Sequence, residues 1–222
     1  MVFLTAWACL FAVGHGAPGE RVLILGAGGG VGTAAVQLAV QRGLVAYGTA
    51  GTEAKRRFVT EELGAAACFD SRGEWASPLS RAVGERGLDL ALDPVGGRAT
   101  AHCRDLLSPL GRLVFYGMSA GLPGRRRSWL SAAWAWLRTP RFHPLSLVEP
   151  CLSVGGVHLL HLGRREGLLR GAFEEMLPRF AEGSLRPVVD STFELSAAGA
   201  AAAHARLHAR QNLGKVVLVA RA

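Results

Sequence analysis

Short apolar runs alternate with longer amphipathic stretches through the first half of the chain. The apolar runs predict β-strands at residues 22–25, 44–49, 66–69, 88–93 and 111–116. The stretches between them predict helices at 33–39, 53–63, 74–84 and 98–107. Because the apolar runs are nearly continuous, both faces of each strand are expected to be covered. Strands that alternate with helices in this way predict the α/β class, with a doubly wound parallel sheet.

The second half of the chain has a less regular pattern. Prolines and glycines interrupt residues 121–150, around an apolar, tryptophan-rich stretch that predicts a helix at 128–137. Beyond it we expect a strand at 152–159, a helix at 165–181, an extended segment at 186–193, a helix at 196–210 and a strand at 215–219. The apolar residues 1–13 are too few to span a bilayer, which takes about 20 residues. They also lack the positive start of a signal peptide and predict a buried helix.

A glycine-rich turn at residues 26–32 separates the first strand from the first helix. In the G-x-G-x-x-G pattern of dinucleotide-binding turns, Gly29 and Gly32 fill the second and third positions, and Ala27 stands in the first. Gly29 would let the backbone approach a pyrophosphate, and Gly32 would let the helix pack closely on the strand. The helix N-terminus would attract the phosphate charge. The alternative is a tight turn without a ligand.

The residues after the second strand indicate which dinucleotide would bind. Proteins selective for NAD place an acidic residue there to hold the ribose 2′-hydroxyl. Here residues 48–52 contain no acid, and Lys55 and Arg56 follow. A lysine would attract the 2′-phosphate of NADPH, so we expect NADPH over NADH. Glu53 is the competing acid, and we interpret it as a first-turn charge that compensates the helix dipole.

Composition narrows the classes of protein further. The chain has 222 residues, half of them hydrophobic, and a formal charge of +8 that comes almost wholly from arginine. The arginines are dispersed and form no continuous basic stripe, so we do not expect nucleic-acid binding. The four cysteines are far apart and contain no C-x-x-C pair, so we expect neither a disulfide framework nor a structural metal site. Scattered single cysteines favour the cytoplasm.

Three motifs support other functions. Residues 117–121 match the G-x-S-x-G of α/β-hydrolases, with Asp190 and then His204 or His208 in triad order, although Pro123 opposes the helix that this motif needs. His204 and His208 also have a metal-like i, i+4 spacing, but Ala205 stands where a glutamate would be expected, and an exposed helix face explains them better. The run 125–127 beside tryptophans could dock on an anionic membrane, cover a substrate cavity or form a dimer contact.

Taken together, these motifs give the chain a clear resemblance. It resembles the medium-chain dehydrogenase/reductase superfamily, in particular the zinc-independent quinone oxidoreductases, and is similar to the synaptic-vesicle membrane protein homologue group and its bacterial relatives. The matching segments are 4–7, 18–23, 27–32 with Gln37 and Leu38, 48–55, 89–97, 111–117 and 212–217. The resemblance implies a lead-in connection at 1–18, an NAD(P)-binding Rossmann domain at 19–185 and a C-terminal return segment at 186–222.

The resemblance also assigns roles to residues. Thr5 would lie beside the nicotinamide ribose, and Gly29, Gly30 and Val31 would hold the pyrophosphate. The adenosine 2′-phosphate would contact Gly51 and Lys55, with Ser71 near the adenosine. The nicotinamide side would be lined by Val95, Gly117, Met118 and Ser119, and the far rim of the site by Asn212. No metal ligand is implied.

The implied reaction is hydride transfer from NADPH to a quinone or an α,β-unsaturated carbonyl. A proton donor is needed near the developing enolate, and Tyr116 and His158 are the candidates. The resemblance implies that superfamily members carry an N-terminal, chaperonin-10-like substrate domain, which we expect to be missing here. We therefore expect a fragment, a homo-oligomer or a subunit completed by another chain. The alternative function is an NADPH-binding module or sensor without catalysis of its own.

Overall fold

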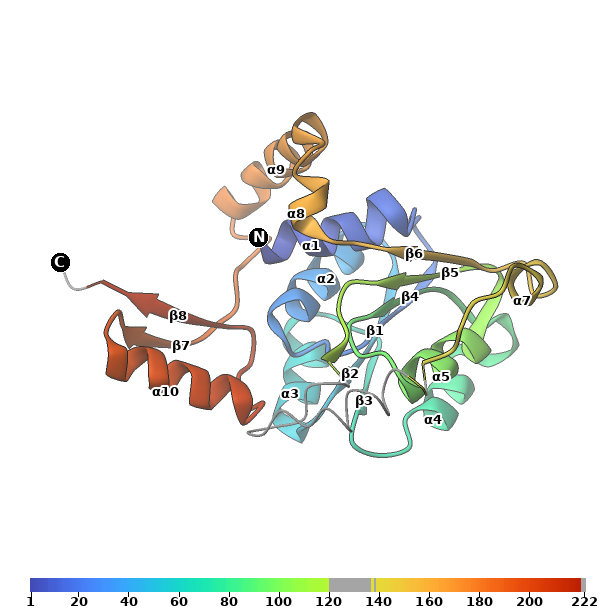
Figure 1. Cartoon of the computed structure of the whole chain (residues 1–222), viewed down its shortest axis with the longest axis horizontal. Helices are drawn as coiled ribbons and strands as arrows, with labels where there is room; N and C mark the ends of the chain where they lie inside the picture. The colour runs from blue at the N-terminus through green and yellow to red at the C-terminus, as the bar shows by residue number, and fades with distance from the viewer. Residues whose placement is uncertain (120–136, 138, 221–222) are drawn as a thin grey trace.

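Strand β1 (Arg21–Ile24) lies at the centre of a six-stranded parallel sheet with the order β3-β2-β1-β4-β5-β6. The computed structural model describes residues 1–119, 137 and 139–220. Within these residues, helices cover both faces of the sheet (Figure 1). The doubly wound α/β prediction is therefore confirmed. The tryptophan-rich helix and the proposed membrane contact at 125–136 lie outside the described residues.

The elements of the sheet follow the predicted alternation. Its other strands are β2 (Val45–Ala50), β3 (Ala67–Asp70), β4 (Leu88–Asp93), β5 (Leu107–Phe115) and β6 (Ser153–Gly156). The helical segments between strands β1 and β5 are α2 (Gly30–Gln41), α3 (Glu53–Arg57), η2 (Phe58–Glu62), α4 (Ala76–Val83), η3 (Gly84–Arg86) and α5 (Arg98–Leu106). The remaining helices are α1 (Val2–Trp7), η1 (Ala8–Val13), α7 (Pro144–Val148), α8 (Leu159–Leu162), α9 (Glu166–Ala181) and α10 (Ala197–His208).

Two hydrophobic clusters, one on each face, hold the sheet in place. One contains Ile24, Leu90 and Val114 and packs against α1, η1 and α2. The other contains Leu23 and Leu113 and packs against α4 and α5. Successive strand residues point to opposite faces, so nearly continuous apolar runs are needed to fill both clusters.

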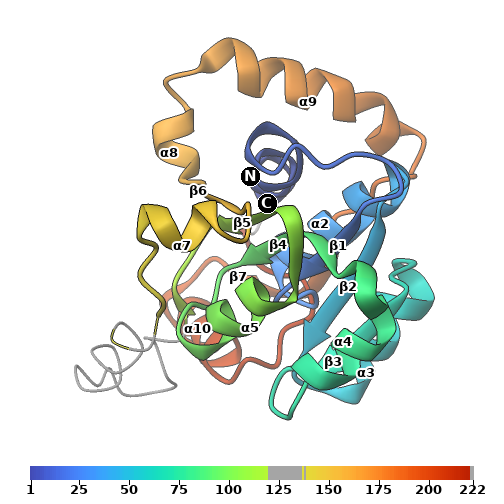
Figure 2. The same ribbon diagram turned by 90° about the vertical axis from the view of Figure 1, so that its right-hand side faces the viewer.

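The apolar N-terminus belongs to the first of these clusters. Helix α1 and the π-helical turn η1 bury a row of apolar side chains: Phe3, Ala6, Ala8, Cys9 and Leu10. Helix α9 lies over this segment, as Figure 2 shows, and Phe180 meets the Phe3 ring at 4.8 Å between centroids. The predicted buried helix is confirmed. Within the described part of the chain, no helix is both long and apolar enough to cross a bilayer.

Several predicted boundaries differ from the structure, and three of them show the physical reason. Helix α2 begins at Gly30, not Thr33, because tertiary packing holds three residues of low or modest helix propensity in the first turn. Strand β5 begins at Leu107, before the predicted residue 111, and tolerates the left-handed Leu110. Strand β6 spans four residues instead of 152–159, because the chain turns at His158 into α8.

The C-terminal segment forms a separate small unit beside the main sheet (Figure 1). It pairs β7 (Val189–Glu194) with β8 (Lys215–Val219) in parallel, with α10 between them in sequence. Asp190 connects the unit internally, because it accepts hydrogen bonds from Arg206 and from the Leu213 amide. These interactions, opposed by burial, lower the pKa of the Asp190 carboxyl. The ionised Asp190 carboxylate therefore links β7 to α10 and to the residues just before β8.

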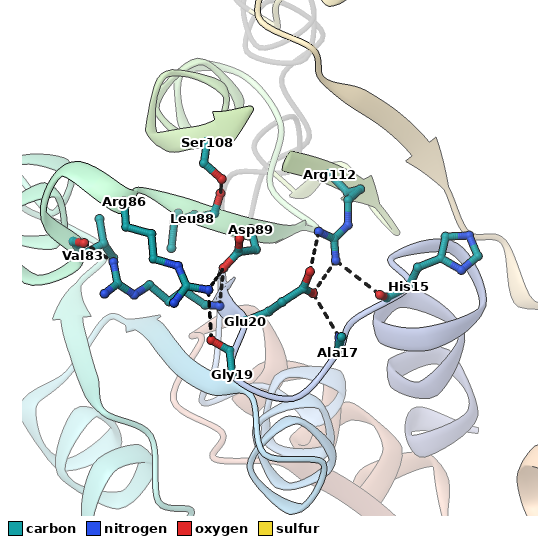
Figure 3. Close-up of polar contacts among 11 residues, drawn as sticks. His15, Ala17, Gly19, Glu20, Val83, Arg86, Leu88, Asp89, Ser108 and Arg112 are labelled. Atoms are coloured by element: carbon teal, nitrogen blue, oxygen red, sulfur yellow. Dashed lines mark hydrogen bonds and ion pairs between the residues drawn. The ribbon is translucent and has the colours of Figure 1, made fainter. Parts of the chain in front are cut away.

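A polar cluster lies where β1 and β4 begin, at the opposite end of these strands from the glycine-rich turn. Figure 3 shows the contacts within this cluster. Arg112 donates to both carboxylate oxygens of Glu20 and also to the Gly14 carbonyl. Burial tends to raise the pKa of Glu20, but the bonds from Arg112 and the Ala17 amide, with the charges of Arg112 and Arg86, lower it overall. No local sequence pattern indicated this pair, which joins residues 92 apart.

Replacing Glu20 with glutamine is expected to reduce the free energy of unfolding by about 1 kcal/mol at pH 7. Since the folded-state pKa of Glu20 is lowered, its ionised form stabilises the fold above the unfolded-state pKa of about 4.3, and this contribution is lost as pH falls further. The difference between wild type and E20Q should therefore shrink in urea unfolding measured below about pH 4. The exposed Arg57–Glu61 pair gives the control, and E61Q should change stability little at either pH. An E20Q effect that stays constant with pH would contradict the assignment.

Candidate cofactor-binding site

The carboxyl ends of the first five strands along the chain surround one cavity. Its volume is about 360 Å³, and it is lined by Gly26, Gly28, Gly29, Thr49, Ala50, Gly51, Lys55, Ser71, Arg72, Val95, Ser119, Arg210 and Asn212. Thr49 and Ala50 are the last residues of β2, and the other lining residues follow β1, β2, β3, β4 and β5 or come from the C-terminal segment. In open α/β sheets, ligands bind outside the carboxyl ends of the strands, at the point where the strand order reverses. This cavity lies at that point, between β1 and β4.

A larger groove of about 530 Å³ lies between α2, η2 and residues 183–188. Its wall includes Gln37 and Arg186, which already bond to each other through the Arg186 backbone. The groove is away from the carboxyl ends of the strands. We therefore assign the functional site to the smaller cavity.

The glycine-rich turn forms the floor of this cavity. Gly26 takes a positive φ of 67°, and the Gly29 amide donates to the Gly26 carbonyl at 2.9 Å. Gly29 then caps α2 without a side chain. The first N–H groups of a helix have no partner inside it, and together with the helix dipole they attract a phosphate.

Close packing explains the third glycine of the pattern. A Cβ on Gly32 would lie 2.3 Å from the Gly26 carbonyl oxygen and 2.7 Å from the Ala27 Cα. Neither atom can move without displacing the turn. This geometry shows that Gly32 lets α2 pack closely on the turn that follows β1.

Three cationic residues line the cavity, and among the described residues no carboxylate does. Lys55 lies over the turn, since a Cβ on Gly28 would be 3.2 Å from its Cδ, and its Nζ donates to the Arg210 carbonyl at 2.9 Å. Burial lowers the pKa of Lys55, and Arg72 and Arg206 lower it further, while Asp190 opposes them. The lining of Lys55, Arg72 and Arg210 favours an anion with more than one charged group.

The C-terminal segment supplies one wall of the cavity. The Gly214 amide donates to the Gly28 carbonyl at 2.9 Å, and Gly214 forms a parallel bridge with Gly29. This docking brings Asn212 to the rim, where its Nδ2 donates to the Gly214 carbonyl. The segment therefore completes the site, although it comes from the opposite end of the chain.

Seven of the predicted cofactor-binding residues line the cavity together. They are Gly29, Gly51, Lys55, Ser71, Val95, Ser119 and Asn212. Their contact with a cofactor stays a prediction.

Five predicted residues lie outside the lining. The Thr5 hydroxyl donates to the Met1 carbonyl within α1, and Val31 packs on the hydrophobic core. Gly30 faces Lys215, whose Cδ would be 2.6 Å from an added Cβ. Gly117 and Met118 are exposed beyond the end of β5. Backbone contacts of these residues with a cofactor stay predictions.

The sequence prediction missed Gly26, Gly28, Thr49, Ala50, Arg72 and Arg210 as lining residues. The first four neighbour the predicted residues and follow from the strand ends. Arg72 could have been found as the residue after Ser71, because the end of β3 lies beside the end of β2. Arg210 carried no local signal, because its position depends on how the C-terminal segment docks.

The two proton-donor candidates lie in different surroundings. The Tyr116 hydroxyl points at the Leu25 carbonyl at 3.5 Å, and burial, with the charges of Cys9 and Asp93, raises its pKa. His158 is exposed at the start of α8, with its ring 4.8 Å from that of His161. Neither residue lines the cavity. The proton donor stays unassigned.

The hydrolase and metal alternatives find no support in the described residues. Asp190 is occupied by Arg206 and Leu213, so it orients no histidine. His204 and His208 line a groove whose other lining residues are alanines within α10 or just after its end. In the described part of the chain, no three His, Cys, Asp or Glu side chains form a group that could hold a metal ion.

The fold and this cavity define a Rossmann-type dinucleotide-binding protein. Residues 63–218 match the family described as zinc-binding dehydrogenase. The chain is 34% identical to the synaptic vesicle membrane protein VAT-1 homolog of Danio rerio over 97% of its own length. It belongs to the medium-chain dehydrogenase/reductase superfamily and is quinone oxidoreductase-like.

Solved structures agree with this assignment. The quinone oxidoreductase of Thermus thermophilus, described with its NADPH complex, has a TM-score of 0.78 and 34% identity, over 98% of this chain and 63% of that chain. The CurK enoyl reductase has a TM-score of 0.76 and 27% identity, over 100% of this chain and 60% of that chain. This chain spans 44% of the length of the Danio rerio relative.

Proposed function

We propose that this chain binds NADPH as part of an oxidoreductase that reduces a quinone or an α,β-unsaturated carbonyl. One observation carries the proposal: in the described part of the chain, the cavity at the carboxyl ends of the strands joins a helix N-terminus without a side-chain cap to three cationic residues and no carboxylate. The similarity to a quinone oxidoreductase and an enoyl reductase supports the substrate class.

The cavity fits a phosphorylated dinucleotide on its own geometry. The turn leaves an open surface at Gly26, where an added Cβ would meet nothing within 4 Å, and this surface adjoins the start of α2. A pyrophosphate placed there would receive backbone N–H groups of the first turn. Residues 51–55 follow β2, where the adenosine ribose is expected, and Gly51 and Lys55 both line the cavity.

The bound nicotinamide would supply the hydride, and the protein would orient it. Val95 and Ser119 extend the cavity past the ends of β4 and β5, where the nicotinamide half is expected. Hydrogen bonds of their backbone amides set their positions: the Ser119 amide donates to the Pro94 carbonyl at 2.8 Å, and the Val95 amide donates to the Asp93 carboxylate at 2.7 Å. These residues bind and orient, and no proton transfer is assigned to them.

Calorimetry with NADPH and NADH, together with quinone-dependent NADPH oxidation in the same samples, tests this function. We expect NADPH to bind more tightly than NADH and quinone to be reduced. Binding without turnover would instead favour the NADPH-binding module. A folded sample that binds neither nucleotide would contradict the proposed cofactor site.

A further inference from the structure

Arg72 is placed beside the residue that follows strand β2. Strand β3 pairs with β2 in parallel, with Ala50 opposite Asp70, so the residues after the two strands meet at the same edge. A Cβ on Gly51 would lie 3.1 Å from the Arg72 Nε and 3.5 Å from the Ser71 Oγ. Gly51 thus leaves the space in which the Arg72 guanidinium lies.

Two other arginines nearby are paired with carboxylates. Arg56 lies 3.3 Å from Asp70, and Arg57 lies 3.1 Å from Glu61. Among the described residues, the Arg72 guanidinium makes no hydrogen bond or ion pair, and Asp70 contacts Arg72 only through the backbone amide. The positive charge of Arg72 instead acts on Lys55 and helps to lower the pKa of that ammonium group. An anion between these two neighbouring cations would relieve their repulsion.

Lys55 already has a hydrogen-bond partner, so a second cationic group is needed to bind a phosphate strongly. Its Nζ is bonded to the Arg210 carbonyl, in the C-terminal segment, at 2.9 Å. Within the described residues, the Arg72 guanidinium has no such bond to break before it binds a ligand. Its planar fork can hold a phosphate through two hydrogen bonds, which a lysine cannot do.

We propose that Arg72 recognises the 2′-phosphate of NADPH and provides the larger part of the discrimination against NADH, with Lys55 tying the C-terminal segment over the cofactor. This inference rests on the proposed NADPH site and extends it to a residue outside the predicted set. It makes Arg72 a specificity-determining residue and assigns it no part in hydride transfer.

The test compares R72M, R72K and R57M with the wild-type chain in calorimetry against NADPH and NADH. Adenosine 2′,5′-bisphosphate and AMP serve as fragment probes that need no turnover. R72M should raise the Kd for NADPH and for the bisphosphate about tenfold to a hundredfold, since hydrogen bonds between charged groups are lost. The Kd values for NADH and AMP should change less than about twofold, and R72K should lie between R72M and wild type.

R57M is the matched control, because it removes one exposed positive charge from α3 outside the cavity. It should leave every Kd within about twofold, since exposed charges beyond about 8 Å are screened at physiological salt. Equal weakening of both nucleotides by R72M, or no change with either, would overturn the role of Arg72 while the proposed function stands. A folded wild-type chain that binds neither nucleotide, or prefers NADH, would overturn both. Thermal unfolding of each variant checks that the exposed substitutions leave the fold intact.

Discussion

Replacing Gly32 with alanine is expected to lower the free energy of unfolding by about 3 kcal/mol and to abolish measurable dinucleotide binding. The added Cβ would lie 2.3 Å from the Gly26 carbonyl oxygen and 2.8 Å from the Ala27 carbonyl carbon. These are backbone atoms of the turn itself, so relief requires the start of α2 to move away from β1. That movement would remove the phosphate-binding geometry as well as core packing.

Gly171 provides the matched control for this experiment. It is also a helical glycine, in α9, but an added Cβ there would meet nothing within 4 Å. G171A should stabilise the protein by about 0.5–1 kcal/mol, because alanine is the better helix former. Urea unfolding of both variants, with NADPH calorimetry, measures the contrast. A G32A protein as stable as wild type would show that the turn can yield, contrary to the packing argument.

Replacing Asp93 with alanine is expected to cost about 3 kcal/mol of stability and to weaken nucleotide binding. The carboxylate is fully buried at the end of β4. It accepts the Val95 and Gly96 amides at 2.7 and 2.9 Å and the Thr100 hydroxyl at 2.6 Å. Alanine would leave these donors buried without an acceptor and would release the turn that places Val95 in the cavity.

Asp105 gives a comparison at the surface, where its side chain is 58% exposed and pairs with Arg104. D105A should change stability by less than about 0.5 kcal/mol, because exposed ion pairs contribute little. Denaturant unfolding measures both variants, and calorimetry with NADPH reports the effect on the cavity. Equal stability of D93A and D105A would mean that the turn is held by the backbone alone.

Much of the main sheet could be predicted because its signals are local. The apolar runs at 22–25 and 88–93 indicated the central strands, and glycines marked the turn between the first strand and helix. The errors came at boundaries, where propensity competes with packing. Gly30 is a poor helix former, yet it opens α2 at a place where an added Cβ would lie 2.6 Å from the Lys215 Cδ and 3.5 Å from the Val2 Cγ1. No local pattern marks such a contact.

The candidate site was predictable in part for the same reason. Gly51 and Ser71 follow strands directly, and Gly29 lies in the turn after β1, so a correct strand assignment places them at the carboxyl edge of the sheet. Arg210 could not be placed in this way. It meets Lys55 from 155 residues away in the sequence, through a docking of the C-terminal segment that no periodicity encodes.

The sequence by itself determined the α/β class, the dinucleotide-binding turn and the lack of an acid after the second strand, because each depends on residues close together in the chain. Only the tertiary structure decided which side chains share the cavity and how the charges around it are paired. The parallel pairing of β2 with β3 places Arg72 beside Gly51, and Asp70 forms an ion pair with Arg56. The cavity lining and the ion pairs depend on distances between segments that are far apart in the sequence, because burial and charge interactions act through space.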